Sequence, residues 1–172
     1  MKQEFYNKRL FILGLIIAAV VAFLDLYSKS LVFNFLDDLG LSNQLKHPQL
    51  AITGFFNLVQ VWNKGISFGM FNKLDGGKYI ILSANLIILV VLLVWLYKNE
   101  ILYLTWAIGL IIGGAAGNII DRILNDAVAD FLDFYIGEYH WPAFNLADSA
   151  VFLGVALLLL ENYFIKPRKN EK

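Results

Sequence analysis

Four long apolar stretches constrain this sequence more than any other feature. Each is long enough, or nearly so, to cross the roughly 30 Å hydrocarbon core of a bilayer as a helix. Because hydrocarbon offers no partners to backbone N–H and C=O groups, spanning segments of this kind are expected to be helical. The stretches therefore predict four transmembrane helices, over about 10–29, 79–97, 101–120 and 143–165.

The composition supports a membrane protein. Hydrophobic residues make up 59% of the chain and charged residues 16%, whereas soluble domains have roughly 45–50% and about 25%. So little polar surface excludes a soluble enzyme, a disordered linker or a nucleic-acid-binding arm as the leading interpretation. The sequence contains no cysteine, which excludes disulfides and thiolate chemistry. Residues 1–172 are expected to form a single membrane domain.

The first stretch resembles a signal peptide in having a basic start, at Lys2, Lys8 and Arg9. However, no A-x-A cleavage site follows it, and Asp25 to Lys29 stand there instead. A retained span is therefore expected. Eight of the 14 basic residues fall at the N-terminus, near residue 98 and in the C-terminal tail. By the positive-inside rule, both termini are predicted to be cytoplasmic.

The first outer segment, 30–78, is too long for a plain connection. Residues 55–62 are rich in β-formers, a turn signal follows at 63–65, and residues 66–71 are again apolar. This pattern predicts a β-hairpin within about 52–75, lying on the outer leaflet. Residues 122–142 are expected to be a short acidic connection. The predicted fold class is an all-α membrane protein with four transmembrane helices and a small extracytoplasmic β element.

Two patterns on the predicted helices indicate packing. Asp25 and Lys29 are four residues apart and share a helix face, which favours an ion pair over direct catalysis. Gly109, Gly113 and Gly117 recur every four residues. Such a stripe lets helix backbones approach closely.

Asn118, Asp121 and Arg122 follow the glycine stripe and share one helix face. One interpretation is helix capping with an interfacial Asp–Arg pair. The other is a polar floor beside a site, in which Arg122 holds an acceptor-rich ligand. The spacing alone supports both equally.

Asp130 and Asp148 are candidates for acid–base chemistry. A lone Asp148 near the start of an apolar helix is explained by the helix dipole. However, Asn145 lies on the same face, and the connection back to Asp130 is short enough for the carboxyl groups to meet. Two carboxyls near an apolar phase share one proton. The ionised one can activate water and the protonated one can polarise a peptide carbonyl, which is aspartic-protease chemistry.

Other chemistries have weaker support. His47 and His140 are the only histidines, and no H-E-x-x-H motif is present, so the sequence does not favour a zinc site. A Ser/Lys dyad involving Lys29 with Ser28 or Ser149 remains conceivable, although adjacent Ser28 and Lys29 point apart on a helix. No basic stripe indicates a nucleic-acid partner. We predict no metal and no cofactor.

Five patches together resemble the lipoprotein signal peptidase (signal peptidase II) family, in the order of the family and across all four spans. They are Asp25-x-x-x-Lys29; Phe56-Asn57 with Asn63-Lys64-Gly65-Ile66-Ser67-Phe68-Gly69; Gly113-Gly114-Ala115-Ala116-Gly117-Asn118-Ile119-Ile120-Asp121-Arg122; Val128-Ala129-Asp130-Phe131; and Phe144-Asn145-Leu146-Ala147-Asp148. The sequence departs from the family pattern at Ser67, where alanine is usual, and at Ala129, where valine is common. Both departures are expected to change packing only.

The resemblance implies an aspartic endopeptidase of the bacterial inner membrane. It would remove the signal peptide from diacylglyceryl-modified prolipoproteins, cleaving just before the lipidated cysteine, with its site near the outer face and membrane lipid around it. By position, Asp130 and Asp148 match the catalytic pair. The residues that match substrate-contacting positions are Asn63, Gly65, Asn118, Arg122 and Asn145. Those that match structural positions are Asp25, Lys29 and Asp121. A non-enzymatic lipid carrier or scaffold, packed through the glycine stripe, is the alternative from another class.

Overall fold

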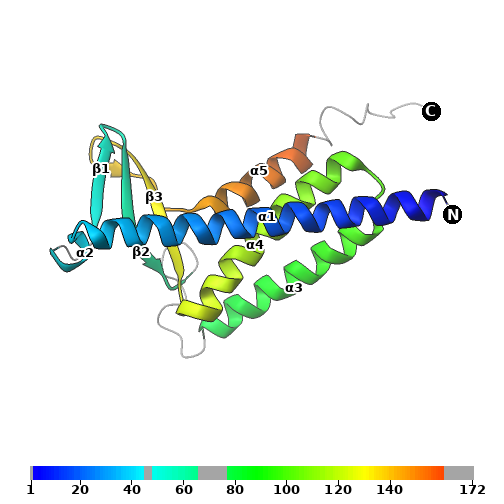
Figure 1. The fold of residues 1–172 in the computed structure, drawn as a ribbon, viewed down its shortest axis with the longest axis horizontal. Coiled ribbons are helices and arrows are strands. Elements are labelled where there is room, and N and C mark those ends of the chain that lie inside the picture. The colour runs from blue at the N-terminus through cyan, green and yellow to red at the C-terminus, as the bar shows by residue number, and fades with distance from the viewer. Residues whose placement is uncertain (1, 45–47, 66–76, 161–172) are drawn as a thin grey trace, which may run out of the picture.

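The computed structural model describes residues 2–44, 48–65 and 77–160. Four helices of 15 residues or more form a bundle, and a small sheet lies at one end of it (Figure 1). The helices are α1 (Lys2–Asp38), α3 (Gly77–Lys98), α4 (Leu102–Asn125) and α5 (Leu146–Leu160), with a four-residue helix α2 (Leu41–Gln44) after α1. α4 lies at the centre and packs against α1, α3 and α5.

The predicted class of apolar helices with a β element is confirmed. Within the described residues, α1, α3 and α4 are long and apolar enough to cross a membrane. α1 extends beyond the predicted 10–29 at both ends. α5 has 15 described residues from Leu146, and the predicted end of this span, 161–165, lies outside the described residues.

The glycine stripe brings α4 close to α1. A Cβ added at Gly113 would stand 2.7 Å from the carbonyl oxygen of Ala18, and one at Gly117 would stand 2.5 Å from Oδ2 of Asp25. On another side of α4, a Cβ at Gly114 would overlap the carbonyl oxygen of Ala147 on α5. Small residues therefore set the spacing of the bundle, as the sequence predicted.

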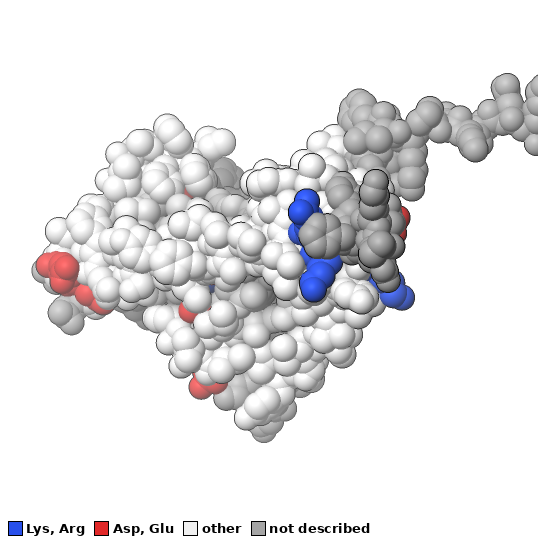
Figure 2. Space-filling view, turned by 45° about the vertical axis from the view of Figure 1, so that its right-hand side comes forward, with Lys and Arg blue, Asp and Glu red and all other residues white. Residues whose placement is uncertain are grey.

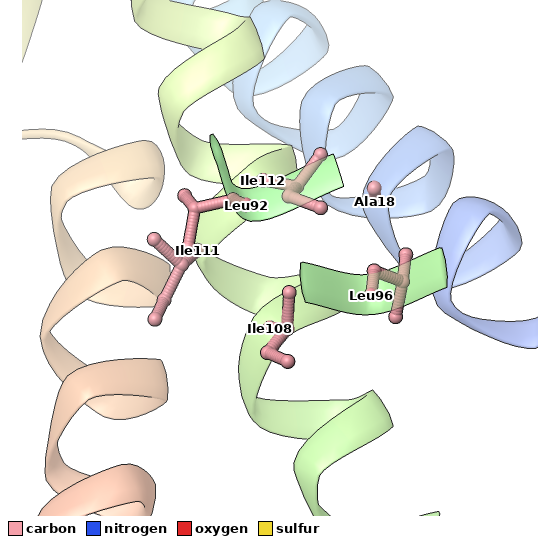
Figure 3. Close-up of a cluster of buried hydrophobic side chains, with 6 residues drawn as sticks. All are labelled: Ala18, Leu92, Leu96, Ile108, Ile111 and Ile112. Carbon is pink, nitrogen blue, oxygen red and sulfur yellow. The ribbon is translucent and has the colours of Figure 1, made fainter. Parts of the chain in front are cut away.

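The apolar core of the bundle lies where α1, α3 and α4 meet. Figure 3 shows its six buried side chains, which are Ala18, Leu92, Leu96, Ile108, Ile111 and Ile112. Many large apolar side chains on the outer faces of α1 and α3 are instead exposed, including Ile16, Phe23, Ile87 and Val91. Figure 2 shows a face with few charged side chains between its two ends. A bundle with this surface is matched to lipid rather than to water.

The sheet has four antiparallel strands in chain order. They are β1 (Gln49–Thr53), β2 (Phe56–Asn63), β3 (Val128–Ile136) and β4 (Tyr139–His140). The C-terminal end of α1 supports the sheet, because Phe33 packs there with Ala129 and Phe131 of β3. The Phe33 ring also meets that of Trp62 edge-on, with centroids 5.1 Å apart. The extra length of α1 therefore holds the sheet in place at the end of the bundle.

Two details of the predicted β element differ from the structure. The strand predicted over 55–62 is present as β2, but its described hairpin partner is β1, which precedes it. The other predicted strand, 66–71, lies outside the described residues. The short acidic connection predicted over 122–142 leads to α5 as expected, but it also contains β3 and β4, which the sequence did not predict. Asp130 and Asp133 interrupt the apolar pattern of β3, and both are buried by tertiary contacts.

Candidate active site

Asp130 lies on β3 with 2% of its surface exposed. Two amides fix its carboxyl group. Asn63, at the end of β2, donates from Nδ2 to Oδ2 at 3.0 Å, and Asn145 donates from Nδ2 to Oδ1 at 2.7 Å. The N–H of Gly65 donates to Oδ1 of Asn63 at 3.1 Å. This contact orients the Asn63 amide so that its NH₂ group faces Asp130.

Asp148 lies in the first turn of α5, which it shares with the capping residue Asn145. The Asp148 N–H donates to Oδ1 of Asn145 at 2.9 Å, and the Asn145 N–H donates to Oδ2 of Asp148 at 3.3 Å. These reciprocal bonds form a capping box. Asn118 of α4 donates from Nδ2 to the other oxygen, Oδ1, at 2.8 Å. The helix-terminus interpretation of Asp148 is therefore correct, and it also aims the carboxylate at the site.

The two carboxyl groups come together at Asn145. Its side-chain amide binds Asp130 and its backbone N–H binds Asp148. The pKa of Asp130 is raised from 3.8 to about 6, mainly by burial and further by the charge of Asp148, against the hydrogen bonds from Asn63 and Asn145. Within the described ranges, no Lys, Arg or His nitrogen forms an ion pair with either carboxylate. Such a pair can hold one proton between two carboxyls.

A second acidic cluster lies beside this pair. The ammonium of Lys29 is 2.6 Å from Oδ2 of Asp25 and 2.9 Å from Oδ2 of Asp121. Backbone N–H groups complete the cluster: that of Ala147 donates to Asp25 at 2.8 Å and that of Ala129 donates to Asp121 at 3.1 Å. The predicted Asp25–Lys29 pair is confirmed, and it ties α1 to α4 and α5.

Asn118 connects the two clusters. Lys29 donates to Oδ1 of Asn118 at 3.0 Å. Because Lys29 occupies the carbonyl end of the amide, the NH₂ end is directed at Asp148. The Asn145 amide also donates to Oδ1 of Asn118, at 3.2 Å. The cation thus orients the side chains of the Asp130–Asp148 pair without touching either carboxylate.

Arg122 lies one turn beyond Asn118 and is half-buried. Its Nη1 donates to the carbonyl oxygen of Asn118 at 3.3 Å. Its positive charge interacts electrostatically with Asp148, Asp130 and Asp121. Asp121 bonds to Lys29 and to the backbone of Ala129, with no described hydrogen bond to Arg122. The remaining N–H donors of the guanidinium can therefore bind an acceptor-rich group in the groove beside it.

Two grooves meet at Asp148 and Arg122. The outer groove, of about 810 Å³, lies between the sheet, α3 and α4, and its lining includes Asn63, Gly65, Ile81, Asn85, Arg122, Trp141, Phe144 and Asp148. The lateral groove, of about 590 Å³, descends between α3, α4 and α5. Its lining is mostly apolar and includes Asn85, Ile88, Ile111, Ala115, Val151, Phe152 and Val155. The site therefore faces both the polar end of the bundle and its lipid-facing side.

One residue of the site was missed at the sequence level. Asn85 lines both grooves from α3. Asn85 could have been identified as a candidate site residue because it is an amide in the middle of an apolar span. Polar side chains in hydrocarbon are costly and tend to serve a site. The sequence did not assign a role to Asp133 either. Its carboxylate accepts from Asn57 at 2.8 Å and lies 2.9 Å from Nδ1 of His140, which ties β2 to β4.

The geometry does not support the other chemistries. The hydroxyl of Ser28 donates to the backbone oxygen of Asp25 at 2.9 Å, while the Lys29 ammonium binds carboxylates. The hydroxyl of Ser149 donates to the Asn145 carbonyl at 3.0 Å. Among the residues described, no group of three or more acidic, His or Cys side chains could hold a metal ion. His47 lies outside the described residues.

Comparison with known sequences identifies the family. The family model described as "Signal peptidase (SPase) II" matches residues 17–164. A lipoprotein signal peptidase of Anaplasma phagocytophilum is 36% identical over 148 residues, which cover 86% of this chain and 90% of the relative. A lipoprotein signal peptidase of Aeromonas hydrophila subsp. hydrophila is 40% identical over 157 residues, which cover 88% of this chain and 89% of the relative.

The fold agrees with this result. Two solved structures of bacterial membrane enzymes superpose with TM-scores of 0.70 and 0.72, at 30% and 29% identity. They cover 92% and 89% of this chain, and 94% of each solved chain is covered. With its two carboxyl groups meeting where the sheet joins the helical bundle, this multi-pass membrane chain belongs to the signal peptidase II family, the aspartic peptidases that process prolipoproteins.

Proposed function

We propose that Asp130 and Asp148 are the catalytic pair of this peptidase, and that residues 1–172 form one peptidase domain. The observation that carries the proposal is the meeting of both carboxyl groups at Asn145. The raised pKa of Asp130 supports it as the partner that holds the proton. Asp148, which is partly buried and lines both grooves, is then the base.

In the proposed reaction, Asp148 takes a proton from a water molecule that attacks the scissile carbonyl. Asp130 donates its proton to the carbonyl oxygen, which gives a tetrahedral diol. Collapse of the diol breaks the C–N bond: Asp148 gives its proton to the leaving nitrogen, and one diol hydroxyl returns a proton to Asp130. The products are a carboxylic acid on the signal peptide and a free amino group on the lipidated cysteine. The pair ends with one proton, ready for the next turnover.

The substrate is a prolipoprotein whose cysteine carries a diacylglyceryl group, and the cut falls just before that cysteine. The apolar lateral groove suits the acyl chains, since its lining is continuous with the lipid-facing surface. The outer groove suits the extended peptide, with its polar contacts from Asn63, Gly65 and Arg122. Burial of the acyl chains would hold the scissile bond against the acid pair. Asn118 and Asn145 orient the pair, while Asp25, Lys29 and Asp121 support them.

The charge distribution supports one orientation. The sheet and the site lie at the end of the bundle opposite the N-terminus and the α3–α4 turn. With both termini cytoplasmic, as the basic residues favour, the site lies near the outer face of a bacterial inner membrane.

The native chain lacks cysteine, so Glu138→Cys and Glu100→Cys can report on this orientation directly. An impermeant maleimide added outside cells stripped of their outer membrane should label the first variant only; the reverse would overturn the orientation.

The catalytic proposal is tested with a purified diacylglyceryl-modified precursor peptide. Asp130→Asn and Asp148→Asn should each abolish release of the signal fragment while leaving the helical circular dichroism spectrum and thermal midpoint near those of the native protein. Asp126→Asn is the matched control, since Asp126 is exposed at the end of α4 and its left-handed conformation, φ 57°, suits asparagine. Full activity in either dyad variant would remove that aspartate from the mechanism.

A further inference from the structure

A cavity unrelated to the acid pair lies at the opposite end of the bundle. It has a volume of about 660 Å³ and lies between the start of α1 and the turn from α3 to α4. Its lining consists of Asn7, Lys8, Phe11, Tyr97, Lys98 and Glu100. Because helices at this end leave the predicted hydrocarbon span, the cavity lies at the depth of the lipid headgroups.

The charge of the cavity is positive. Lys8 and Lys98 supply two ammonium groups against the single carboxylate of Glu100. That carboxylate accepts from Nδ2 of Asn7 at 2.8 Å. In the described part of the chain, neither lysine has an ion-pair partner. Figure 2 shows Lys and Arg side chains gathered at this end of the molecule. The cavity therefore has uncompensated cations to offer an anionic group.

Two aromatic side chains, Phe11 and Tyr97, line the cavity. The Phe11 and Tyr97 rings meet edge-on, with centroids 5.5 Å apart, and so join α1 to α3. Both rings line the cavity, and Tyr97 is largely exposed. Aromatic side chains of this kind sit at the level of headgroups, with an apolar body toward the acyl chains. A ligand in the cavity would thus have both ammonium groups and an apolar surface within its lining.

We propose that this cavity binds the headgroup of an anionic phospholipid, with phosphatidylglycerol as its best match. The two ammonium groups would hold the phosphate, as basic pockets between transmembrane helices do on the cytoplasmic side. Glu100 can accept hydrogen bonds from the headgroup hydroxyls, while it disfavours a second phosphate. The acyl chains extend along the lipid-facing surfaces of α1 and α3. This site is separate from the acid pair and does not depend on the catalytic proposal.

The test measures lipid retention by native mass spectrometry of the intact protein, released from nanodiscs of phosphatidylglycerol, phosphatidylethanolamine or phosphatidylcholine. The native protein should retain phosphatidylglycerol in preference to both zwitterionic lipids. Lys8→Gln and Lys98→Gln should each weaken retention about fivefold, and the double variant about 25-fold. Arg9→Gln removes the same charge from the same helix without touching the cavity, and its effect should be below about twofold.

Four results would overturn the proposal. Equal retention of phosphatidylglycerol by the native protein and the double variant would mean that the lysines do not hold it. An equal loss in Arg9→Gln would mean a general surface charge effect. Retention of the zwitterionic lipids to the same extent would exclude selection of an anion. Inorganic phosphate at millimolar concentration should not displace the lipid; displacement would identify a free-phosphate site instead. Circular dichroism in lipid-free detergent verifies folding, and the single variants carry the test if the double variant does not fold.

Discussion

Two acidic clusters lie side by side where the bundle meets the sheet, and Asn118 contacts both of them. The side chains that surround the two clusters differ. Asp25 and Asp121 share one ammonium group, that of Lys29, and each also accepts a backbone N–H. Asp130 and Asp148 are held by neutral amides and meet at Asn145. The first cluster balances two negative charges with one cation and several donors. The second has no described ion pair.

This difference in surroundings explains why one cluster supports the structure and the other is suited to acid–base catalysis. A buried carboxylate that contacts a cation is held in place by it, and removing that cation is costly. A buried carboxyl held by amides can exist in both protonation states, which acid–base catalysis requires. Aspartate side chains thus take a structural role where a cation contacts them and a catalytic role where only neutral amides do. The comparison predicts opposite consequences for variants of the two clusters.

The largest expected effect is on turnover. Asp130→Asn should reduce kcat on a diacylglyceryl-modified peptide by about 10⁴-fold, the upper range for loss of an acid–base group, with little change in the thermal midpoint. Asp25→Asn should do the reverse, lowering the thermal midpoint while the folded fraction keeps measurable turnover. Both variants are measured by fluorogenic peptide cleavage and by thermal unfolding in detergent. Similar losses of turnover in both would erase the distinction between the clusters.

The next effect is on stability. Lys29→Met removes the cation between Asp25 and Asp121 and should lower the free energy of unfolding by about 3–5 kcal/mol, because two carboxylates stay buried without compensation. Thermal or denaturant unfolding in detergent measures the loss. Lys64→Met is the control, since Lys64 is exposed, and it should change stability by less than about 0.5 kcal/mol. A native-like midpoint for Lys29→Met would show that the cluster contributes no stability.

A smaller loss of stability is expected where α4 packs against the cluster of Asp25, Lys29 and Asp121. Gly117→Ala places a methyl group 2.5 Å from Oδ2 of Asp25, so the helices must separate or the ion pair must shift. Overpacking of this kind costs about 1–3 kcal/mol. Gly54→Ala is the matched control, because an added Cβ there meets no atom within 4 Å. Equal thermal midpoints for the two variants would mean that α1 and α4 tolerate wider spacing.

The smallest effect concerns pH. With one proton on the pair in its active form, kcat/KM should fall about tenfold per pH unit once the pH exceeds the Asp130 pKa of about 6. The hydrogen bond from Asn63 lowers this pKa, so Asn63→Ala should move the alkaline limb to higher pH. Asn57→Ser is the control, because Asn57 lies on the same strand and bonds to Asp133 instead. A limb that moves to lower pH in Asn63→Ala would contradict the assignment of the proton to Asp130.

Lys29 shows how the clusters depend on each other. Its contact with Asn118 orients the amide that binds Asp148. Lys29→Met should therefore reduce turnover as well as stability, even where the protein is kept folded by low temperature. The sequence predicted the Asp25–Lys29 pair from its spacing. It could not predict this link, because the contact joins residues 89 positions apart on different helices.

The local chemistry of this protein was determined by the sequence. Apolar length specified the helices, glycine spacing specified a face of α4 that another helix could approach closely, and the five motifs specified the family and its candidate residues, because each of these depends on neighbours within a few turns. Tertiary structure decided the rest. It formed β3 from a segment whose aspartates hid its pattern, and it brought β2, β3, α4 and α5 together around Asn145. It also placed Lys29 beside Asp25 and Asp121, and placed neutral amides beside Asp130 and Asp148. The neighbours of a buried charge come from distant segments, and only packing brings those segments into contact.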